Sequence, residues 1–538
     1  MHKKKATVVK RSSINAALGQ GDKLVVLLQQ ALSLHKNGQL ADAETLYLEI
    51  LKINPRYFDA LQFLGMIQRA KGELQQALDS LSCAAQINPN NLTVHASLGN
   101  VLLDLGRHVD AIASYDRFLA MTPDFAEVLN NKANALSALG RETEAMSYYE
   151  KALQKQPDFA DVYFNRGNLH MDMSRFAHAL NDYEHVLRMN SGHYQAWNNR
   201  GNALFKLGRL SEAMQSYQQG LTIAPDNAEL LGCIANAYKM SGQLNESAQL
   251  YSKVLTLNTQ GFPRQNAALQ LAILHYVHGD AAQVAPLMEV AKEMLIQPHG
   301  KDHGSLIYCL FMLKIQQWWQ AFRLQAKLPN PQGLLYVIGE SHMLSVHNLV
   351  VPYRGQNLQC KGFWVEGCTQ WRVGHTESNH YQQLFTNYLQ SLPVASTVLM
   401  TIGEIDCRID GGILKAHKKS PETGLAQRIH ITISAYLEHI SKVARVRTLN
   451  ILVAGVPAYY IDASAHSEQA LRDFGDFLAL FNAILKQHAI DMGMAFLDVF
   501  ALTDSGAGKS NELWHIDQHH LRPDAMLVAF ERHLMLPQ

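Results

Sequence analysis

The chain has 538 residues, more than a single hydrophobic core normally organises, so we expect at least two domains. Hydrophobic residues make up 47% of the sequence, which is enough to form sizeable cores. Lys and Arg number 47, as do Asp and Glu, so the formal net charge is zero. No overall field therefore attracts nucleic acid or an anionic membrane surface, and we expect neither as a partner.

Residues 1–22 begin with a basic stretch from Met1 to Arg11 that no apolar run follows, which predicts a disordered tail rather than a signal peptide. No run of about 18 apolar residues occurs, so no membrane span is expected. The six cysteines are sparse and form no Cys-x-x-Cys pair, as is typical of free thiols in a reducing compartment. Together these features predict a cytoplasmic protein.

Residues 23–295 carry an internal repeat with a period of 34 residues. The units share four landmarks: a glycine in all but one unit, a small residue five positions later, an aromatic residue in most units, and a proline near the end of most units. The glycines are Gly38, Gly72, Gly106, Gly140, Gly208 and Gly242, with Ser174 in the one gap. The small residues are Ala43, Ala77, Ala111, Ala145, Ala179, Ala213 and Ser247. The tyrosines are Tyr47, Tyr115, Tyr149, Tyr183, Tyr217 and Tyr251. The prolines are Pro55, Pro89, Pro123, Pro157 and Pro225.

Each of these positions has a mechanical role in a pair of helices. The glycine can take the left-handed conformation that ends the first helix, the small residue lets the second helix cross closely, and the proline ends the unit. The pattern resembles the tetratricopeptide repeat (TPR), with seven units over about Leu24 to Gly261 and a degenerate capping unit from Phe262 to about Met294. The resemblance implies an all-α superhelix whose concave groove binds a protein or peptide.

Asparagine also recurs with the repeat, and a second set lies three residues earlier, so both sets share one helix face. The two sets are Asn100, Asn134, Asn168, Asn202 and Asn236, and Asn131, Asn165 and Asn199. One hypothesis is a ladder of amides that binds the backbone of an extended peptide, similar to the asparagine ladder in the repeats of O-GlcNAc transferases. The other is a set of residues that stabilise the repeats by bonding a neighbouring helix. The sequence leaves both open.

Residues 296–330 predict a helical linker, because Ser305–Phe322 is apolar-rich with helical spacing and Pro329-Asn330-Pro331 marks a boundary. In residues 331–538, strand-like runs then alternate with helix-length segments, which predicts a doubly wound α/β domain with a parallel sheet. The expected strands are Leu334–Ile338, Gln359–Val365, Thr397–Ile402, Asn450–Ala454 and Ala495–Phe500. The expected helices are His380–Leu392, Leu425–Val446 and Ser467–Met492.

Ser341 lies two residues beyond the glycine that ends the first strand, at the edge where open α/β sheets place their ligands. A serine hydroxyl needs a base and an orienting group to become a nucleophile. Asp517 and His520 lie three residues apart near the end of the sequence, a spacing that lets the carboxylate bond one imidazole nitrogen while the other faces outward. These three residues predict a nucleophile, base and orienter.

This second half resembles the SGNH (GDSL-type) hydrolase family, from about Gly333 onward. Its first block appears as Gly339-Glu340-Ser341, with Glu in place of Asp, and its last block as Asp517-x-x-His520. The resemblance implies a three-layer, flavodoxin-like α/β domain. It also implies that Ser341 is the nucleophile, His520 the general base and acid, and Asp517 the orienter.

The third family block, Gly-x-Asn-Asp, aligns with Gly403-Glu404-Ile405-Asp406, so Ile405 replaces the oxyanion-hole asparagine. Losing one such donor costs on the order of a hundredfold or more in rate. Arg408 is a nearby cation that could substitute. For the second-block glycine Gly374 is the better match and Gly367 the weaker one, and either would offer a backbone N–H to the oxyanion.

Simpler interpretations stay open. Ser341 could be a helix N-cap, and Asp406 could form an ion pair with Arg408. A metal site at His515, Asp517, His519 and His520 is not expected, because adjacent loop histidines usually point apart. We expect no cofactor.

The sequence therefore favours a serine esterase or O-acyltransferase recruited to a protein partner by the repeats. The family resemblance implies an ester substrate, with O-acetylated carbohydrate as the plausible class. The alternative is a TPR interaction scaffold whose SGNH-like domain is a binding module with little or no catalysis.

Overall fold

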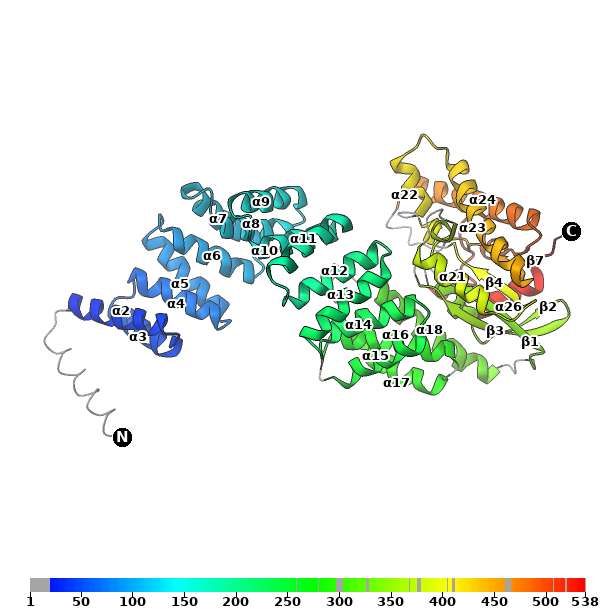
Figure 1. Cartoon of the computed structure of the whole chain (residues 1–538), viewed down its shortest axis with the longest axis horizontal. Coiled ribbons are helices and arrows are strands. Elements are labelled where there is room, and N and C mark those ends of the chain that lie inside the picture. The colour runs from blue at the N-terminus through cyan, green and yellow to red at the C-terminus, as the bar shows by residue number, and fades with distance from the viewer. Residues whose placement is uncertain are drawn as a thin grey trace. The chain divides into compact units, whose positions relative to one another are not determined.

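The structure is a computed structural model that describes residues 20–257, 259–278, 280–296, 303–325, 329–366, 368–374, 379–403, 405–408, 412–459, 466–506, 508–517 and 520–537. Most of the predicted tail, residues 1–19, lies outside these ranges, and helix α2 already begins at Gln20, inside the range predicted as a tail. The chain divides into two compact units, Met1–Ala203 and Leu204–Gln538 (Figure 1). The last repeats therefore belong to the same unit as the carboxyl-terminal sheet.

The repeats form successive antiparallel helix pairs, as the 34-residue period predicts. The helices up to the unit boundary are α2 (Gln20–Lys36), α3 (Leu40–Ile53), α4 (Phe58–Ala70), α5 (Leu74–Ile87), α6 (Leu92–Asp104), α7 (His108–Met121), α8 (Ala126–Ala138), α9 (Glu142–Lys155), α10 (Ala160–Asp172), α11 (Phe176–Met189) and α12 (Tyr194–Lys206). The helices that follow are α13 (Leu210–Ile223), α14 (Ala228–Met240), α15 (Leu244–Thr256), α16 (Phe262–His278), α17 (Ala281–Ala291), η1 (Lys292–Leu295) and α18 (His303–Gln325).

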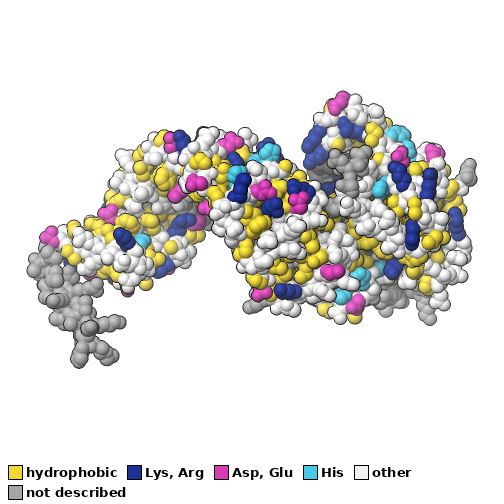
Figure 2. Space-filling view, viewed as in Figure 1, with side chains coloured by type: hydrophobic (Ala, Val, Ile, Leu, Met, Phe, Trp, Pro, Cys, Tyr) yellow, Lys and Arg dark blue, Asp and Glu magenta, His cyan; other side chains and the backbone are white. Residues whose placement is uncertain are grey.

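The recurring residues have the roles expected of them. Gly140 takes a left-handed conformation with φ +71°, and Ser174 takes the same conformation with φ +58°. The six recurring tyrosines are among the largest fully buried side chains, and the small residue Ala111 has no exposed surface. A Cβ at Gly99 would lie 2.4 Å from the ring of Tyr115, so only glycine permits this approach of α6 and α7. On the visible face of the repeats, acidic and basic side chains are interspersed (Figure 2).

The second unit contains a seven-stranded mixed sheet with the order β2-β3-β1-β4-β5-β6-β7. The strands are β1 (Gly333–Gly339), β2 (Val350–Tyr353), β3 (Gln356–Trp364), β4 (Thr397–Thr401), β5 (Asn450–Ala454), β6 (Ala495–Leu497) and β7 (Leu534–Met535). The five central strands are parallel, whereas β2 and β7 run antiparallel to β3 and β6. The predicted parallel sheet is present in the five central strands. The prediction missed the two antiparallel edge strands, which pair with their neighbours without a crossover helix.

Helices cover both faces of this sheet. The helices of this part of the chain are α19 (Ser341–Val346), α20 (Gln370–Gly374), α21 (His380–Ser391), η2 (Ile405–Cys407), α22 (Gly412–Lys419), α23 (Leu425–Arg447), α24 (Glu468–Asp491), α25 (Val499–Thr503) and α26 (Pro523–Arg532). The predicted strand to Phe500 was wrong beyond Leu497. There the Asp498 side chain accepts a hydrogen bond from the Ala501 N–H at 2.9 Å and starts α25.

One hydrophobic core joins the last repeats to the sheet. It contains buried side chains of α16, α17 and α18 together with Leu335 and Val337 of β1 and Met526 of α26. A second core fills the opposite face, between the sheet and α21, α23 and α24. Because α18 packs into the first core, it lies directly against the α/β part of the unit.

Candidate functional site

Ser341 is the first residue of α19, immediately beyond the carboxyl end of β1. The chain must pass very close to β4 at this point, because a Cβ on Gly339 would lie 1.9 Å from the Thr401 Oγ1. Ser341 and the preceding Glu340 are both buried, with 6% and 4% of their surfaces exposed. The predicted nucleophile therefore lies at the carboxyl edge of the parallel strands, where open α/β sheets generally place their ligands, and it is enclosed.

Asp517 and His520 are in direct contact. The Asp517 Oδ1 lies 2.8 Å from His520 Nδ1 and also accepts the His520 backbone N–H at 2.9 Å. A carboxylate only accepts hydrogen bonds at neutral pH, so the Nδ1 atom carries the proton and Nε2 is left as the basic nitrogen. His520 is 3% exposed. This pair has the geometry of a base held by its orienter.

Helix α19 and the His520 loop are tied together. Ser345 donates a hydrogen bond through its hydroxyl to the Leu521 carbonyl at 2.8 Å. The ring centroid of His342, the neighbour of Ser341, lies 5.8 Å from that of His520. Segments that are far apart in the sequence thus bring α19, which begins at Ser341, and the loop that carries His520 to one edge of the sheet.

A small cavity of ≈ 20 Å³ lies at this edge. It is lined by His342, by the ends of β4 and β5 with the residues that follow them, and by Leu521. A cavity of this size accommodates about one water molecule.

The segment after β4 is anchored by a residue that the sequence did not single out, Gln370. Its backbone N–H donates to the buried Asp406 carboxylate at 2.7 Å, and its Nε2 donates to the Ile402 carbonyl at 2.8 Å. Gly403 has φ +144°, and a Cβ there would lie 2.9 Å from the Gln370 Nε2. Asp406 thus holds the start of α20, a role that becomes visible only when the two segments meet.

The two candidate oxyanion donors have different surroundings. Gly374 ends α20, where a Cβ would lie 2.5 Å from the backbone nitrogen of Tyr436 in α23, so helix packing alone requires glycine. Arg408 follows η2 and its side chain is exposed. Gly367, Glu404 and His519 lie outside the described residues. The oxyanion role of Gly374 and Arg408 stays a prediction.

Several ladder asparagines bond to neighbouring helices within the repeats. The Oδ1 atoms of three of them accept hydrogen bonds from the tyrosine hydroxyls of the following helix: Tyr115 to Asn100 at 2.8 Å, Tyr149 to Asn134 at 2.6 Å and Tyr183 to Asn168 at 2.8 Å. Side-chain amides of the next repeat add Asn131 to Asn100 at 3.0 Å and Asn199 to Asn168 at 2.9 Å, while Asn165 donates to Asn130 at 3.1 Å. These are the contacts expected if the asparagines stabilise the repeats.

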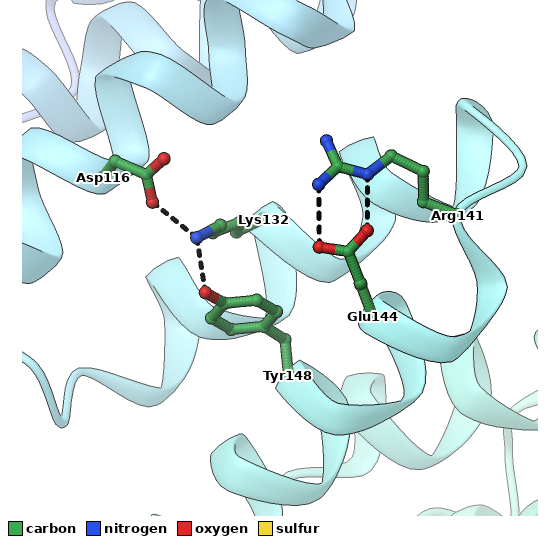
Figure 3. Close-up of polar contacts among 5 residues, drawn as sticks. All are labelled: Asp116, Lys132, Arg141, Glu144 and Tyr148. Atoms are coloured by element: carbon green, nitrogen blue, oxygen red, sulfur yellow. Dashed lines mark hydrogen bonds and ion pairs between the residues drawn. The ribbon is translucent and has the colours of Figure 1, made fainter.

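A set of basic residues follows the same period, and our sequence reasoning missed it. Lys132, only 7% exposed, donates to Asp116 at 2.5 Å and to the Tyr148 hydroxyl at 2.6 Å, so it joins α7, α8 and α9 (Figure 3). Arg166, one period later, pairs with Asp182 at 2.7 Å. The spacing of 34 residues between these cations could have identified them in the sequence.

Figure 3 also shows Arg141 and Glu144, whose two hydrogen bonds of 2.7 Å link the turn after α8 to α9. This pair is largely exposed, so it contributes little to stability.

The second unit contains a larger pocket of ≈ 660 Å³. Amide side chains of α14 and α16, Asn236, Asn266 and Gln270, line it together with Glu366 and Tyr381 of the α/β part. The buried Lys239 beside it donates to Gln270 at 2.7 Å and forms an ion pair with Glu366. The last repeat helices and the α/β part thus line one pocket together, and Asn236 is the ladder residue in it.

Two general properties bear on function. Among the residues that the structure describes, no group of three or more His, Cys, Asp or Glu side chains is placed to hold a metal ion. None of the described helices is both long and apolar enough to cross a membrane.

Comparisons with known proteins match the repeats. The tetratricopeptide repeat family model matches residues 97–158 and 164–228, and the bacterial transcriptional activator domain matches residues 6–124. No curated protein matches the chain.

Several solved structures are also similar to this chain, and two of those below are described as TPR proteins. One, from Parabacteroides merdae, is 18% identical and covers 47% of this chain and 99% of its own, with a TM-score of 0.39. PilF of Pseudomonas aeruginosa is 25% identical over 39% and 95% of the two chains, with a TM-score of 0.35. YrrB, described as a TPR protein with an unusual peptide-binding site, is 17% identical over 34% and 95%, with a TM-score of 0.29. By its family matches and its helix pairs, the amino-terminal part of this chain consists of tetratricopeptide repeats.

Proposed function

We propose that the second unit is a serine esterase or O-acyltransferase. Ser341 Oγ attacks the carbonyl carbon of an ester while His520 Nε2 takes the hydroxyl proton. His520 then returns this proton to the leaving alcohol as the acyl-enzyme forms. Asp517 holds the imidazole and stabilises its protonated form. The hydrogen bond of 2.8 Å between Asp517 and His520, beside the helix that begins at Ser341, is the observation on which this proposal rests.

The topology of the sheet supports this assignment. The parallel strands follow the order β3-β1-β4-β5-β6, the order of flavodoxin-like folds, in which ligands bind beyond the carboxyl ends of the strands. Ser341 follows β1, the second strand of this order, beside which the strand order reverses. The resemblance to SGNH hydrolases rests on the same residues and suggests O-acetyl groups on carbohydrate as substrate.

In this proposal, the oxyanion is stabilised by the backbone N–H groups of Ser341 and Gly374, with Arg408 supplying a positive charge in place of the donor that Ile405 lacks. The acyl-enzyme is then released by water or by a sugar hydroxyl. All six cysteines are thiols in the structure rather than disulfides, which supports a reducing compartment such as the cytoplasm.

The proposed role of the repeats, residues 23–295, is to bring a protein or peptide partner to this α/β domain, residues 331–538. The asparagine ladder would bind its backbone in the groove. Because several ladder oxygens already accept hydrogen bonds within the repeats, the peptide would bond to the remaining donor capacity of the amides.

A second candidate is a TPR interaction scaffold whose α/β domain binds a ligand without turnover. Two observations favour it. Ile405 replaces the family's oxyanion asparagine, and Ser341 and His520 are both closely enclosed.

Labelling with a fluorophosphonate probe separates the two candidates, because the probe bonds only to an activated serine. For the enzyme, we expect one adduct, mapped by mass spectrometry to Ser341 and lost in Ser341→Ala. Asp517→Asn should label on the order of a hundredfold more slowly or worse, because the imidazole then loses its orienting charge. Ser252→Ala, an exposed serine of α15, is the matched control and should label like the wild type.

Hydrolysis of p-nitrophenyl acetate by the same variants provides a second measurement. Equal rates for wild type and Ser341→Ala, with no adduct on any serine, would overturn the enzyme and leave the scaffold. An adduct on another serine would overturn the assignment of Ser341 and move the site to that residue.

A further inference from the structure

Helix α18, expected from the sequence to be a linker, covers the His520 ring. Phe311 of this helix has no exposed surface, and its ring stacks on the His520 imidazole with centroids 3.8 Å apart and planes inclined by only 13°. Three residues further along α18, Lys314 donates through Nζ to the Ile516 carbonyl at 2.8 Å. The helix thus holds the loop that carries the proposed base at two points.

The same part of the chain also reaches the helix that begins at Ser341. Tyr276 of α16 donates through its hydroxyl to the Leu344 carbonyl of α19 at 3.1 Å, and Trp319 of α18 donates to the Tyr276 hydroxyl at 3.0 Å. Elements that precede the sheet in the sequence therefore contact both the base and the nucleophile helix.

The hydrogen bond from Nδ1 to Asp517 limits rotation of the imidazole about its Cβ–Cγ bond, but the ring can still tilt within the range of angles that this hydrogen bond allows. The Phe311 ring, packed flat on one face of the imidazole, restricts this tilt and so fixes the direction in which Nε2 points. The negative face of a benzene ring also favours a cation above it, so Phe311 stabilises the imidazolium that forms when the base takes a proton.

We propose that Phe311 is a positioning residue for His520, so that α18 is part of the catalytic centre rather than a connection to it. This inference rests on the proposed function, in which His520 is the base. Phe311 does not touch the substrate. It acts by fixing the plane of the imidazole and favouring its protonated form.

Other groups surround His520. Asp517 bonds its Nδ1, the His342 ring of α19 lies 5.8 Å away, and Lys314 lies on α18. Burial lowers the pKa of His515, on the same loop, to about 4, so this residue stays neutral throughout an assay between pH 5 and 9. These groups are unchanged in a Phe311→Leu variant, which replaces the aromatic face by an aliphatic side chain and keeps the site apolar.

The test compares Phe311→Leu with Met312→Leu, a volume-conserving change at the next position of α18, which is also fully buried. We expect the pH-independent rate of p-nitrophenyl acetate hydrolysis to fall about threefold to tenfold in Phe311→Leu, from the energy of one aromatic stack. The acidic limb of the pH–rate profile should move to lower pH by roughly 0.5 to 1 unit, because the imidazolium loses its aromatic face. Met312→Leu should change neither quantity.

A second measurement does not need turnover. Nitrogen NMR of the full-length protein follows the titration midpoint of the His520 ring, with the melting temperature of each variant as a check of folding. The positioning role is supported if the midpoint falls in Phe311→Leu and does not fall in Met312→Leu. An active wild type whose Phe311→Leu variant keeps both the rate and the midpoint would overturn this inference and leave the proposed enzyme standing. An inactive wild type with an unlabelled Ser341 removes the proposed function, whereas the NMR midpoint still decides the Phe311 contact.

Discussion

Replacing Asn168 by alanine tests whether the asparagine ladder stabilises the repeats. The Asn168 Oδ1 accepts two hydrogen bonds, from the buried Tyr183 hydroxyl at 2.8 Å and from Asn199 at 2.9 Å. Each contributes roughly 1 kcal/mol, and a buried donor left without its acceptor costs roughly 1 to 3 kcal/mol. The Tyr183 hydroxyl also interacts with Asn199, and alanine is the better helix former by about 0.5 kcal/mol. We therefore take the low end of the range, about 1 kcal/mol, for each of the two donors.

The expected loss in the free energy of unfolding is about 2 kcal/mol, which corresponds to a fall of roughly 4 to 8 °C in the melting temperature of a unit of this size. Circular dichroism during thermal and urea unfolding of the full-length chain measures it. Asn181→Ala is the matched control, because Asn181 lies exposed on α11 of the same repeat and should be neutral or slightly stabilising. Adding Tyr183→Phe to Asn168→Ala should cost less than Tyr183→Phe alone, since the shared bond is already absent.

Unchanged stability of Asn168→Ala, or an equal loss in Asn181→Ala, would refute the structural role of the ladder. The asparagines would then be explained better by binding of a peptide, the alternative that the sequence leaves open.

Three further predictions concern single positions. Ser174→Gly should stabilise the repeats by about 0.5 to 1 kcal/mol in urea unfolding. The left-handed conformation, φ +58°, strains serine, and relief of this strain outweighs the extra entropy that glycine gives the unfolded chain. A destabilised variant would contradict this. Burial lowers the pKa of His347 to about 4, below its usual 6.5, so its neutral ring, which accepts the Gly362 N–H at 2.9 Å, favours folding above about pH 6.5. This contribution should be lost as the pH falls from 6.5 to 4, by an amount on the order of a few kcal/mol, and His347→Gln should flatten that part of the stability profile. Gly374→Ala should lower the melting temperature whatever its effect on catalysis, because the new Cβ would lie 2.5 Å from the backbone nitrogen of Tyr436. An unchanged melting temperature would contradict this and show that α20 can move away from α23.

Residues close together in the chain were predictable. The 34-residue period located the helix pairs, and even the serine at position 174 takes the backbone conformation of the glycines it replaces. Helix α18 and helices α21, α23 and α24 lie within a few residues of the predicted segments. The contact between Asp517 and His520 could be predicted because the two residues are only three positions apart in the sequence. These helices and this contact depend on local backbone geometry, which can be inferred from the spacing of residues in the sequence.

Only the tertiary structure decided what packs against these elements. It placed the last repeats in one core with the sheet, laid Phe311 on His520, and used Gly374 to bring α20 against α23. It also added antiparallel strands at both edges of the sheet. The amino-acid pattern of α18 requires only an apolar face and does not specify what covers it, because a contact between distant segments depends on how whole helices are positioned.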